Sequence, residues 1–291
     1  APAWGNVTPA VEGMESKESP WSAQRGFFEA NGYLVVPQFF LPQDGQVLRA
    51  RARALVSGTA AEATFVWGST KSEAGLLRSA ADIAVFQSAD PPPNRWERQE
   101  DVLGGTVKIG HALHDQDPIF AAFSRQRSLQ DLVSDLGYVS PRLLQSMYLP
   151  KPPGLQDTVD WHQDACFLHT HPQRVLGFWF ALDDAYIANG CLWVQPGSHH
   201  MGLARRWVRH SNGGLEYEEY LPSETNDLPG IPLIVSAGSL VVLHDTLLHR
   251  SGPNHSQCYR EAYALHLMDG TAQFSDTNWL QRPENEPFRG F

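Results

Sequence analysis

The sequence has few cysteines, few basic residues and no long apolar runs. Its three cysteines in 291 residues are an odd number at no recognisable spacing, which argues against a disulfide framework and favours a reducing compartment. Lys and Arg number 22 against 32 Asp and Glu, a formal net charge of -10. This balance argues against a sequence-independent grip on nucleic acid or anionic lipid. No stretch approaches the ~18 consecutive apolar residues of a membrane helix. We therefore expect neither a nucleic-acid nor a membrane partner.

The composition is that of an ordinary globular protein. Hydrophobic residues make up 42% and charged residues 19% of the chain, enough to bury a full core. Residues 1–20 carry Pro, Gly, Ser and Glu without periodicity and are predicted to form a mobile arm. Residues 21–291 are predicted to form a single domain. No targeting pattern is visible, so a cytoplasmic location is the default expectation.

Hydrophobic patterning predicts a mainly β fold with flanking helices. Residues 32–36 form a β-branched run, and helices are expected over 42–58 and from 118 to about 136. Residues 60–105 are uneven and are interpreted as a functional loop or lid. Between about 140 and 270, short apolar runs alternate with turn signals, as in a sandwich or barrel. The run over 175–182 is almost continuously apolar, which is typical of a strand buried on both faces.

The candidate metal site is centred on His162 and Asp164. An imidazole and a carboxylate two residues apart on an extended strand project from the same side. A second imidazole from a distant strand, His249, would complete two histidines and one carboxylate, the facial arrangement that leaves three positions open on iron(II). His244 is the rival for the third ligand. His249 is favoured because it is expected at the end of a strand and is followed by Arg250 and Ser251.

An ordered series of segments carries a family resemblance: His162-Gln163-Asp164, then 189–193, 196–199, and finally His249 with Arg260. The chain resembles the phytanoyl-CoA dioxygenase superfamily of iron(II)- and 2-oxoglutarate-dependent oxygenases, and within it the phytanoyl-CoA dioxygenase domain-containing protein 1 group. The resemblance runs from about Lys108 to the C-terminus and more weakly through the 32–36 segment. It implies a double-stranded β-helix, a jelly-roll or cupin-like barrel, with Fe(II), 2-oxoglutarate and O2 at its open end.

The resemblance also implies roles for single residues. His162, Asp164 and His249 would bind iron. Arg260 and Ser251 would hold the distal carboxylate of 2-oxoglutarate, a role that suits the planar, two-donor fork of arginine. The remaining cosubstrate contacts implied by the resemblance are Lys108, Met147 and Trp179.

The expected reaction is oxidation of a C–H bond in a small organic substrate, with release of succinate and CO2. Halogenases of the wider family carry a small residue where Asp164 stands, so hydroxylation is favoured. One alternative keeps the cofactors but ends in desaturation, epimerisation or ring closure. A second alternative is a metal-binding barrel without turnover. The sequence predicts neither the identity of the substrate nor the oligomeric state.

Other charged residues and histidines are interpreted as surface, cavity-lining or packing residues. The arginines of the expected 42–58 helix are assigned to a solvated face: Arg49, Arg51 and Arg53. A second basic group is also assigned to the surface, with contact to an anionic substrate as the alternative: Arg205, Arg206 and Arg209. His111 and His114 are interpreted as cavity lining or packing, with a metal-binding pair as the alternative.

Overall fold

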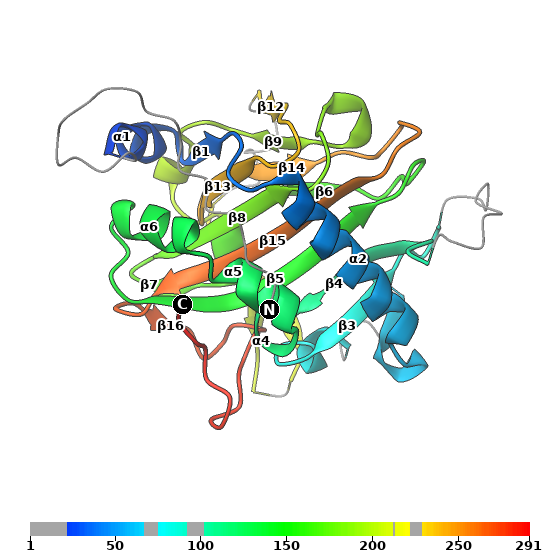
Figure 1. Ribbon diagram of the computed structural model, residues 1–291. Helices are drawn as coiled ribbons and strands as arrows, with labels where there is room; N and C mark the ends of the chain where they lie inside the picture. The colour runs from blue at the N-terminus through cyan, green and yellow to red at the C-terminus, as the bar shows by residue number, and fades with distance from the viewer. Residues whose placement is uncertain (1–21, 67–74, 92–101, 212, 222–228) are drawn as a thin grey trace.

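The computed structural model describes residues 22–66, 75–91, 102–211, 213–221 and 229–291. The arm expected over residues 1–20 lies outside these ranges. Two β-sheets face each other, and helices cover the outer face of the larger one (Figure 1). No helix within the described ranges is long and apolar enough to cross a membrane.

The larger sheet has eight strands among the described residues. In spatial order they are β1 (Tyr33–Val36), β13 (Leu240–His244), β8 (Val175–Ala181), β15 (Arg260–Asp269), β5 (Pro141–Lys151), β4 (Thr106–His111), β3 (Ile83–Gln87) and β2 (Thr64–Val66). All seven residues of β8 are buried, as the apolar run predicted. The pairs from β1 to β3 are antiparallel, and β2 pairs with β3 in parallel.

The smaller sheet faces the larger one and brings the candidate ligands together. Its strands, in order, are β12 (Ile231–Leu233), β9 (Leu192–Val194), β14 (His249–Ser251) and β6 (Val159–His162). Two further pairs are separate from it: β10 (Arg205–Arg209) with β11 (Leu215–Glu219), and β7 (Thr170–His171) with β16 (Gln273–Phe274). Short 3-10 turns are η1 (Ala61–Ala63), η2 (Asp164–Cys166), η3 (Ile187–Asn189) and η4 (Ser198–Met201).

The helices begin at recognisable signals. They are α1 (Ser22–Asn31), α2 (Pro42–Gly58), α4 (Leu113–Gln116), α5 (Pro118–Ser124) and α6 (Arg127–Asp135). Both α2 and α5 start with proline, whose fixed φ suits the first helical position. The Asp117 carboxylate caps α5 by accepting the backbone N–H groups of Ile119 and Phe120. The single helix expected over 118–136 is thus two helices, because the chain turns at Arg125.

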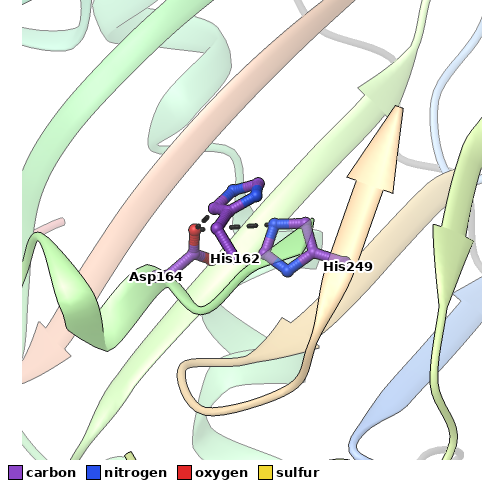
Figure 2. Close-up of side chains that lie close together, drawn as sticks. All are labelled: His162, Asp164 and His249. Carbon is purple, nitrogen blue, oxygen red and sulfur yellow. Dashed lines mark ion pairs between the residues drawn. The ribbon is translucent and has the colours of Figure 1, made fainter. Parts of the chain in front are cut away.

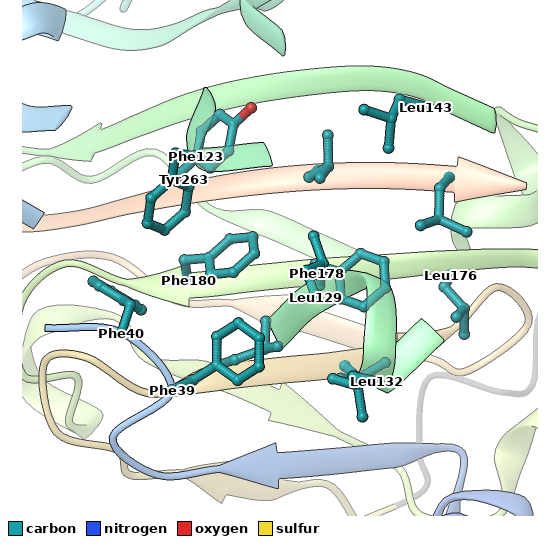
Figure 3. Packing of buried hydrophobic residues seen from close by; sticks show 14 of the residues in the cluster. Phe39, Phe40, Phe123, Leu129, Leu132, Leu143, Leu176, Phe178, Phe180 and Tyr263 are labelled. Carbon is teal, nitrogen blue, oxygen red and sulfur yellow. The ribbon is translucent and has the colours of Figure 1, made fainter. Parts of the chain in front are cut away.

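The main core lies between the helices and the larger sheet (Figure 3). Phe123 of α5 packs edge to face on Phe180 of β8, with ring centroids 5.0 Å apart. Tyr263 of β15 lies 5.9 Å from both rings. This packing fixes one face of β8 and β15, so their opposite face is held rigidly toward the smaller sheet.

Two expectations for the N-terminal third are wrong. The segment 60–105 is not uniformly irregular, because β2 and β3 extend the larger sheet beyond β4. The arginines of α2 do not form a solvated face. Each is paired with an acid that the sequence places far away: Arg49 with Asp183, Arg51 with Asp117 and Arg53 with Glu261.

Candidate metal and cosubstrate site

The register of the smaller sheet places two histidines side by side. His162 is the last residue of β6 and His249 the first of β14, and the two are directly opposite in the antiparallel pair. Their ring centroids are 4.1 Å apart. The strand expected to carry both members of the motif ends at His162, and Asp164 opens η2. Gln163 between them keeps an extended backbone (φ -118°, ψ 135°), so Asp164 still turns toward the histidines.

The three side chains converge on one point (Figure 2). Asp164 Oδ1 lies 3.9 Å from His162 Nε2 and 3.6 Å from His249 Nε2. One ligand atom from each residue can be chosen so that all lie within 4.8 Å of one another. An ion between them could therefore contact all three with little movement of the side chains.

Backbone carbonyls orient both imidazoles. His162 Nδ1 lies 2.8 Å from the Asp160 carbonyl oxygen, and His249 Nδ1 lies 3.0 Å from that of Leu247. A carbonyl only accepts, so each Nδ1 carries the proton and each Nε2 presents its lone pair to the shared point. This is the second hydrogen bond that metal-binding histidines usually make.

The electrostatics suit a cation. Burial, with His249 adding to it, lowers the pKa of His162 to about 4, so its imidazole is neutral at physiological pH. For Asp164, burial alone would raise the pKa, but the nearby His266 and His249 hold it below its ordinary value. Neutral imidazoles and an ionised carboxylate are the forms that bind a metal.

The predicted metal ligands and the implied cosubstrate contacts all line one cavity of about 580 Å³. Besides the triad it is lined by Lys108, Met147, Trp179, Ser251 and Arg260. Met147, Trp179 and Arg260 come from β5, β8 and β15 of the larger sheet, whereas Ser251 comes from β14 of the smaller one. The barrel thus brings together side chains that lie up to 152 positions apart, from Lys108 to Arg260.

Arg260 is a buried guanidinium with unused donors. Its relative exposure is 3%, and burial lowers its pKa to about 10. Its Nε and Nη1 have no hydrogen-bond partner among the described residues, and its guanidinium carbon lies 5.3 Å from the centre of the Trp179 ring. Unpaired buried donors are costly, and a carboxylate is the group that would satisfy them.

Lys151 is a neighbour of Arg260 that the sequence interpretation missed. The two residues are paired across β5 and β15, and both are buried in the cavity wall. Lys151 Nζ donates to Ser251 Oγ at 3.1 Å and to the Gly252 carbonyl. Ser251 in turn donates to the Gly190 carbonyl at 2.9 Å. Two buried cations and a held hydroxyl therefore meet at one end of the cavity.

His266 is the second residue missed. Its Nε2 lies 3.2 Å from Asp164 Oδ2, the carboxylate oxygen that faces away from the other two histidines. A side chain at Gly177 would prevent this arrangement, because a Cβ there would lie 2.7 Å from Asp164 Oδ2. One signal in the sequence could have identified His266. Along a strand, every second residue shares a face, so His266 lies on the same face as Arg260.

The rival histidines have other partners. His244 ends β13 and lies 2.9 Å from Asp245 Oδ1, so the choice of His249 over His244 agrees with the structure. His111 lines the cavity and pairs with Ser79 Oγ at 2.7 Å, as its interpretation as cavity lining predicted. His114 is fully buried and bonds Ser146 Oγ at 2.8 Å, which is a packing role.

The opposite side of the cavity is aromatic. Phe167, Trp207 and Tyr217 line it, and Trp207 is paired with Tyr217 across β10 and β11. Arg205 also lines the cavity and lies over the Tyr217 ring at 4.5 Å, so its assignment to the surface is wrong. Arg206 instead donates to Ser275 and Thr277. The cavity wall therefore carries the buried pair Lys151 and Arg260, an aromatic group that includes the cation Arg205, and the triad.

Comparison with known proteins extends this picture. Residues 28–262 match the family described as phytanoyl-CoA dioxygenase (PhyH). The phytanoyl-CoA dioxygenase domain-containing protein 1 of Bos taurus is 45% identical over 285 residues, covering 93% of this chain and 97% of that protein. A phytanoyl-CoA dioxygenase of Arabidopsis thaliana is 36% identical, covering 89% of this chain and 93% of that protein.

Solved structures share the fold at lower identity. The epimerase SnoN in complex with Fe3+, alpha ketoglutarate and nogalamycin RO aligns with a TM-score of 0.64 at 17% identity, covering 90% of each chain. EctD from S. alaskensis with 2-oxoglutarate and 5-hydroxyectoine aligns at 0.63 and 18%, covering 92% of this chain and 83% of that one. The predicted fold, a double-stranded β-helix with flanking helices, is confirmed.

Proposed function

Because the chain belongs to the phytanoyl-CoA dioxygenase (PhyH) family, we propose that it hydroxylates a C–H bond of a small organic substrate, with release of succinate and CO2. The family and the triad together confirm the expected class, an oxygenase that uses iron and 2-oxoglutarate. A barrel that binds metal without turnover is therefore set aside. The proposal is supported chiefly by one observation: the triad, with the carboxylate Asp164 in it, lines the same cavity as the two unpaired donors of Arg260.

In this proposal, His162, Asp164 and His249 hold the iron through two Nε2 atoms and one carboxylate oxygen. Iron held this way supplies the electrons that triplet oxygen needs before it reacts with a closed-shell molecule. Burial keeps the His162 imidazole neutral, and the carbonyl groups of Asp160 and Leu247 fix the orientation of both rings. Three protein donor atoms leave three positions for the cosubstrate and oxygen.

Arg260 would orient the cosubstrate by binding its distal carboxylate. Its Nε and Nη1 are unpaired, and each can donate to a carboxylate oxygen. Lys151 adds a second buried cation and holds Ser251 in place. Lys151, Ser251 and Arg260 lie on β5, β14 and β15, so a 2-oxo acid bound by them would have its distal carboxylate at this end of the cavity.

The substrate would occupy the aromatic end. Phe167 lies beside the metal site, 6.1 Å from the His162 ring, and stacks edge to face against Trp207 at 5.8 Å. Apolar walls exclude water and favour a substrate whose reacting part is hydrocarbon. The proposal treats residues 21–291 as a single catalytic domain. In support, β1 pairs with β13 at one end, and Leu143 donates to the Arg289 carbonyl at the other.

The first test is succinate release from 2-oxoglutarate in the presence of Fe(II), with His162→Ala as the disabling variant. Removing a metal ligand should reduce turnover by more than the roughly 100-fold typical of lost supporting contacts around a metal. His244→Ala is the matched control, since it removes a half-buried histidine outside the triad. Turnover that survives His162→Ala would refute the ligand assignment. Mass spectrometry of the product then distinguishes hydroxylation, which adds one oxygen atom, from desaturation, epimerisation or ring closure.

A further inference from the structure

We infer that His266 is a positioning residue that holds the second carboxylate oxygen of Asp164, so that Asp164 offers the metal a single oxygen. The inference rests on the metal site proposed above. It assigns a task to a buried side chain that is neither a member of the triad nor part of the Arg260 clamp. Three observations carry it: the division of the carboxylate between partners, the hydrogen bonding of the imidazole, and the glycine beside them.

The two oxygens of Asp164 face different partners. Oδ1 faces the triad histidines, at 3.9 Å from His162 Nε2 and 3.6 Å from His249 Nε2. Oδ2 is turned toward the larger sheet, where His266 Nε2 lies 3.2 Å away. One oxygen thus faces the shared point of the triad, while the other lies within ion-pair distance of His266.

Gln145 sets the protonation of His266. Its side-chain Nε2 lies 3.2 Å from His266 Nδ1. An amide nitrogen only donates, so Nδ1 accepts and the imidazole proton is on Nε2, where it faces Asp164 Oδ2. The imidazole therefore presents its N–H toward Asp164 Oδ2, a buried oxygen 3.2 Å away that has no hydrogen-bond partner among the described residues. The row runs from Gln145 through His266 to Asp164.

The sheet register holds this row in line. His266 on β15 is paired with Gln145 on β5 and with Gly177 on β8. At Gly177, a Cβ would lie 2.7 Å from Asp164 Oδ2 and 3.5 Å from His266 Nε2. The missing side chain leaves the space in which the carboxylate meets the imidazole. Three neighbouring strands thus place the Gln145 amide, the His266 imidazole and the space beside Gly177 at one level of the barrel.

The consequence concerns coordination number. A carboxylate free to rotate can bind a cation through both oxygens. With Oδ2 engaged by His266, Asp164 contributes Oδ1 alone, and three positions remain for 2-oxoglutarate and oxygen. Without the imidazole, a second oxygen would compete for one of these positions, and the carboxylate would also lose its orientation.

The test compares His266→Leu, which removes the donor, with His266→Gln, whose amide N–H can still reach a carboxylate. Mn(II), a redox-inert probe under these conditions, is titrated into each protein by electron paramagnetic resonance, and 2-oxoglutarate is then titrated into the Mn(II)-loaded forms by calorimetry. His266→Leu should weaken Mn(II) binding by roughly 10- to 100-fold, the usual cost of losing a supporting partner. His266→Gln should recover most of that loss. His111→Leu, at another buried histidine of the cavity, should bind Mn(II) like the unmodified protein.

Each outcome decides something. Folded His266→Leu with unchanged Mn(II) and 2-oxoglutarate affinity overturns the inference, as does a His266→Gln variant no better than His266→Leu. Should His266→Leu fail to fold, Gln145→Leu serves in its place, because it frees the imidazole proton and should cost a few-fold in Mn(II) affinity. No loss in that variant also overturns the inference. If His162→Ala binds Mn(II) as well as the unmodified protein, the failure is that of the proposed metal site and is recognisable as such.

Discussion

The two faces of strand β15 show how one element serves both stability and function. Alternate residues of a strand point to opposite sides. One face turns toward the smaller sheet and the cavity: Arg260, Ala262, Ala264 and His266. The other turns toward the helices: Glu261, Tyr263, Leu265 and Leu267. All ten residues of β15 are buried, so burial alone does not distinguish the two faces.

The difference lies in how polar groups are satisfied. On the helix side, Glu261 receives both terminal nitrogens of Arg53, at 2.7 and 3.1 Å, and also the Tyr148 hydroxyl. On the cavity side, Arg260 keeps two donors without a partner among the described residues. Native interiors rarely leave such groups unpaired. On β15, the charged residue with satisfied hydrogen bonds therefore lies on the face that supports the fold, and the one with unpaired donors lies on the cavity face.

The largest loss of stability is expected for a substitution on the helix side of the sheet, at Phe180. The ring is fully buried among Phe40, Phe123 and Tyr263. Phe180→Ala should lower the free energy of unfolding by ~3–5 kcal/mol, measured by urea denaturation, because it leaves a cavity in a packed core. Mn(II) affinity per folded molecule should stay the same. A Phe180→Ala protein that keeps its stability but loses the metal would show that the two faces are not separable.

The next effect is expected on the cavity side, at Arg260. Arg260→Met should weaken 2-oxoglutarate binding to the Mn(II)-loaded protein by ~2–5 kcal/mol, as for a truncated buried charge pair. Mn(II) affinity itself should be unchanged. Stability should hold or rise, since an unpaired buried cation is replaced by an apolar chain of similar length.

Arg53→Met is the matched control on the helix side. It should cost ~1–3 kcal/mol of stability by depriving buried Glu261 of its main partner, and it should leave 2-oxoglutarate affinity intact. Arg53 is partly exposed and Tyr148 still donates to Glu261, which keeps the cost moderate. If Arg53→Met and Arg260→Met changed stability and 2-oxoglutarate affinity in the same way, the group that binds the distal carboxylate would lie elsewhere.

Much of the site could be predicted from the sequence because its motifs are local. His162 and Asp164 are two residues apart, and His249 precedes Ser251 and Arg260 in a fixed order. The short apolar strands after residue 140 predicted a sandwich or barrel, and the family resemblance implied the double-stranded β-helix. These signals depend on neighbours in the chain, so a single sequence displays them.

The parts that could not be predicted depend on pairing across strands. Lys151 and His266 reach the site only through the register of β5 with β15. The arginines of α2 were misassigned because Asp183 and Glu261 lie 134 and 208 positions away. Spacing along a helix can show that a charge lies on a face. It does not show which acid that face will meet.

The last expected effect is a pH dependence that comes from two lysines of the cavity wall. Burial lowers the pKa of Lys151 to about 7, with Arg260 adding to it, and burial lowers that of Lys108 to about 7 as well. In the unfolded chain a lysine titrates near 10.4. Between these values the folded protein binds fewer protons than the unfolded one, so the stability of the cosubstrate-free protein should rise with pH from about 7 to 10.

Cosubstrate binding should show the opposite sign. A carboxylate beside Lys151 favours its ammonium form, so 2-oxoglutarate binding to the Mn(II)-loaded protein should take up protons above pH 7. Binding should weaken by up to about tenfold per pH unit for each lysine that gains a proton. Calorimetry at pH 8 in two buffers of different ionisation enthalpy measures the uptake. Lys151→Met should remove the proton uptake due to Lys151 and leave that due to Lys108. Arg53→Met, at the helix face of β15, should leave the proton uptake unchanged. Binding without proton uptake would mean that the lysines stay neutral beside the ligand, and the clamp would then consist of Arg260 alone.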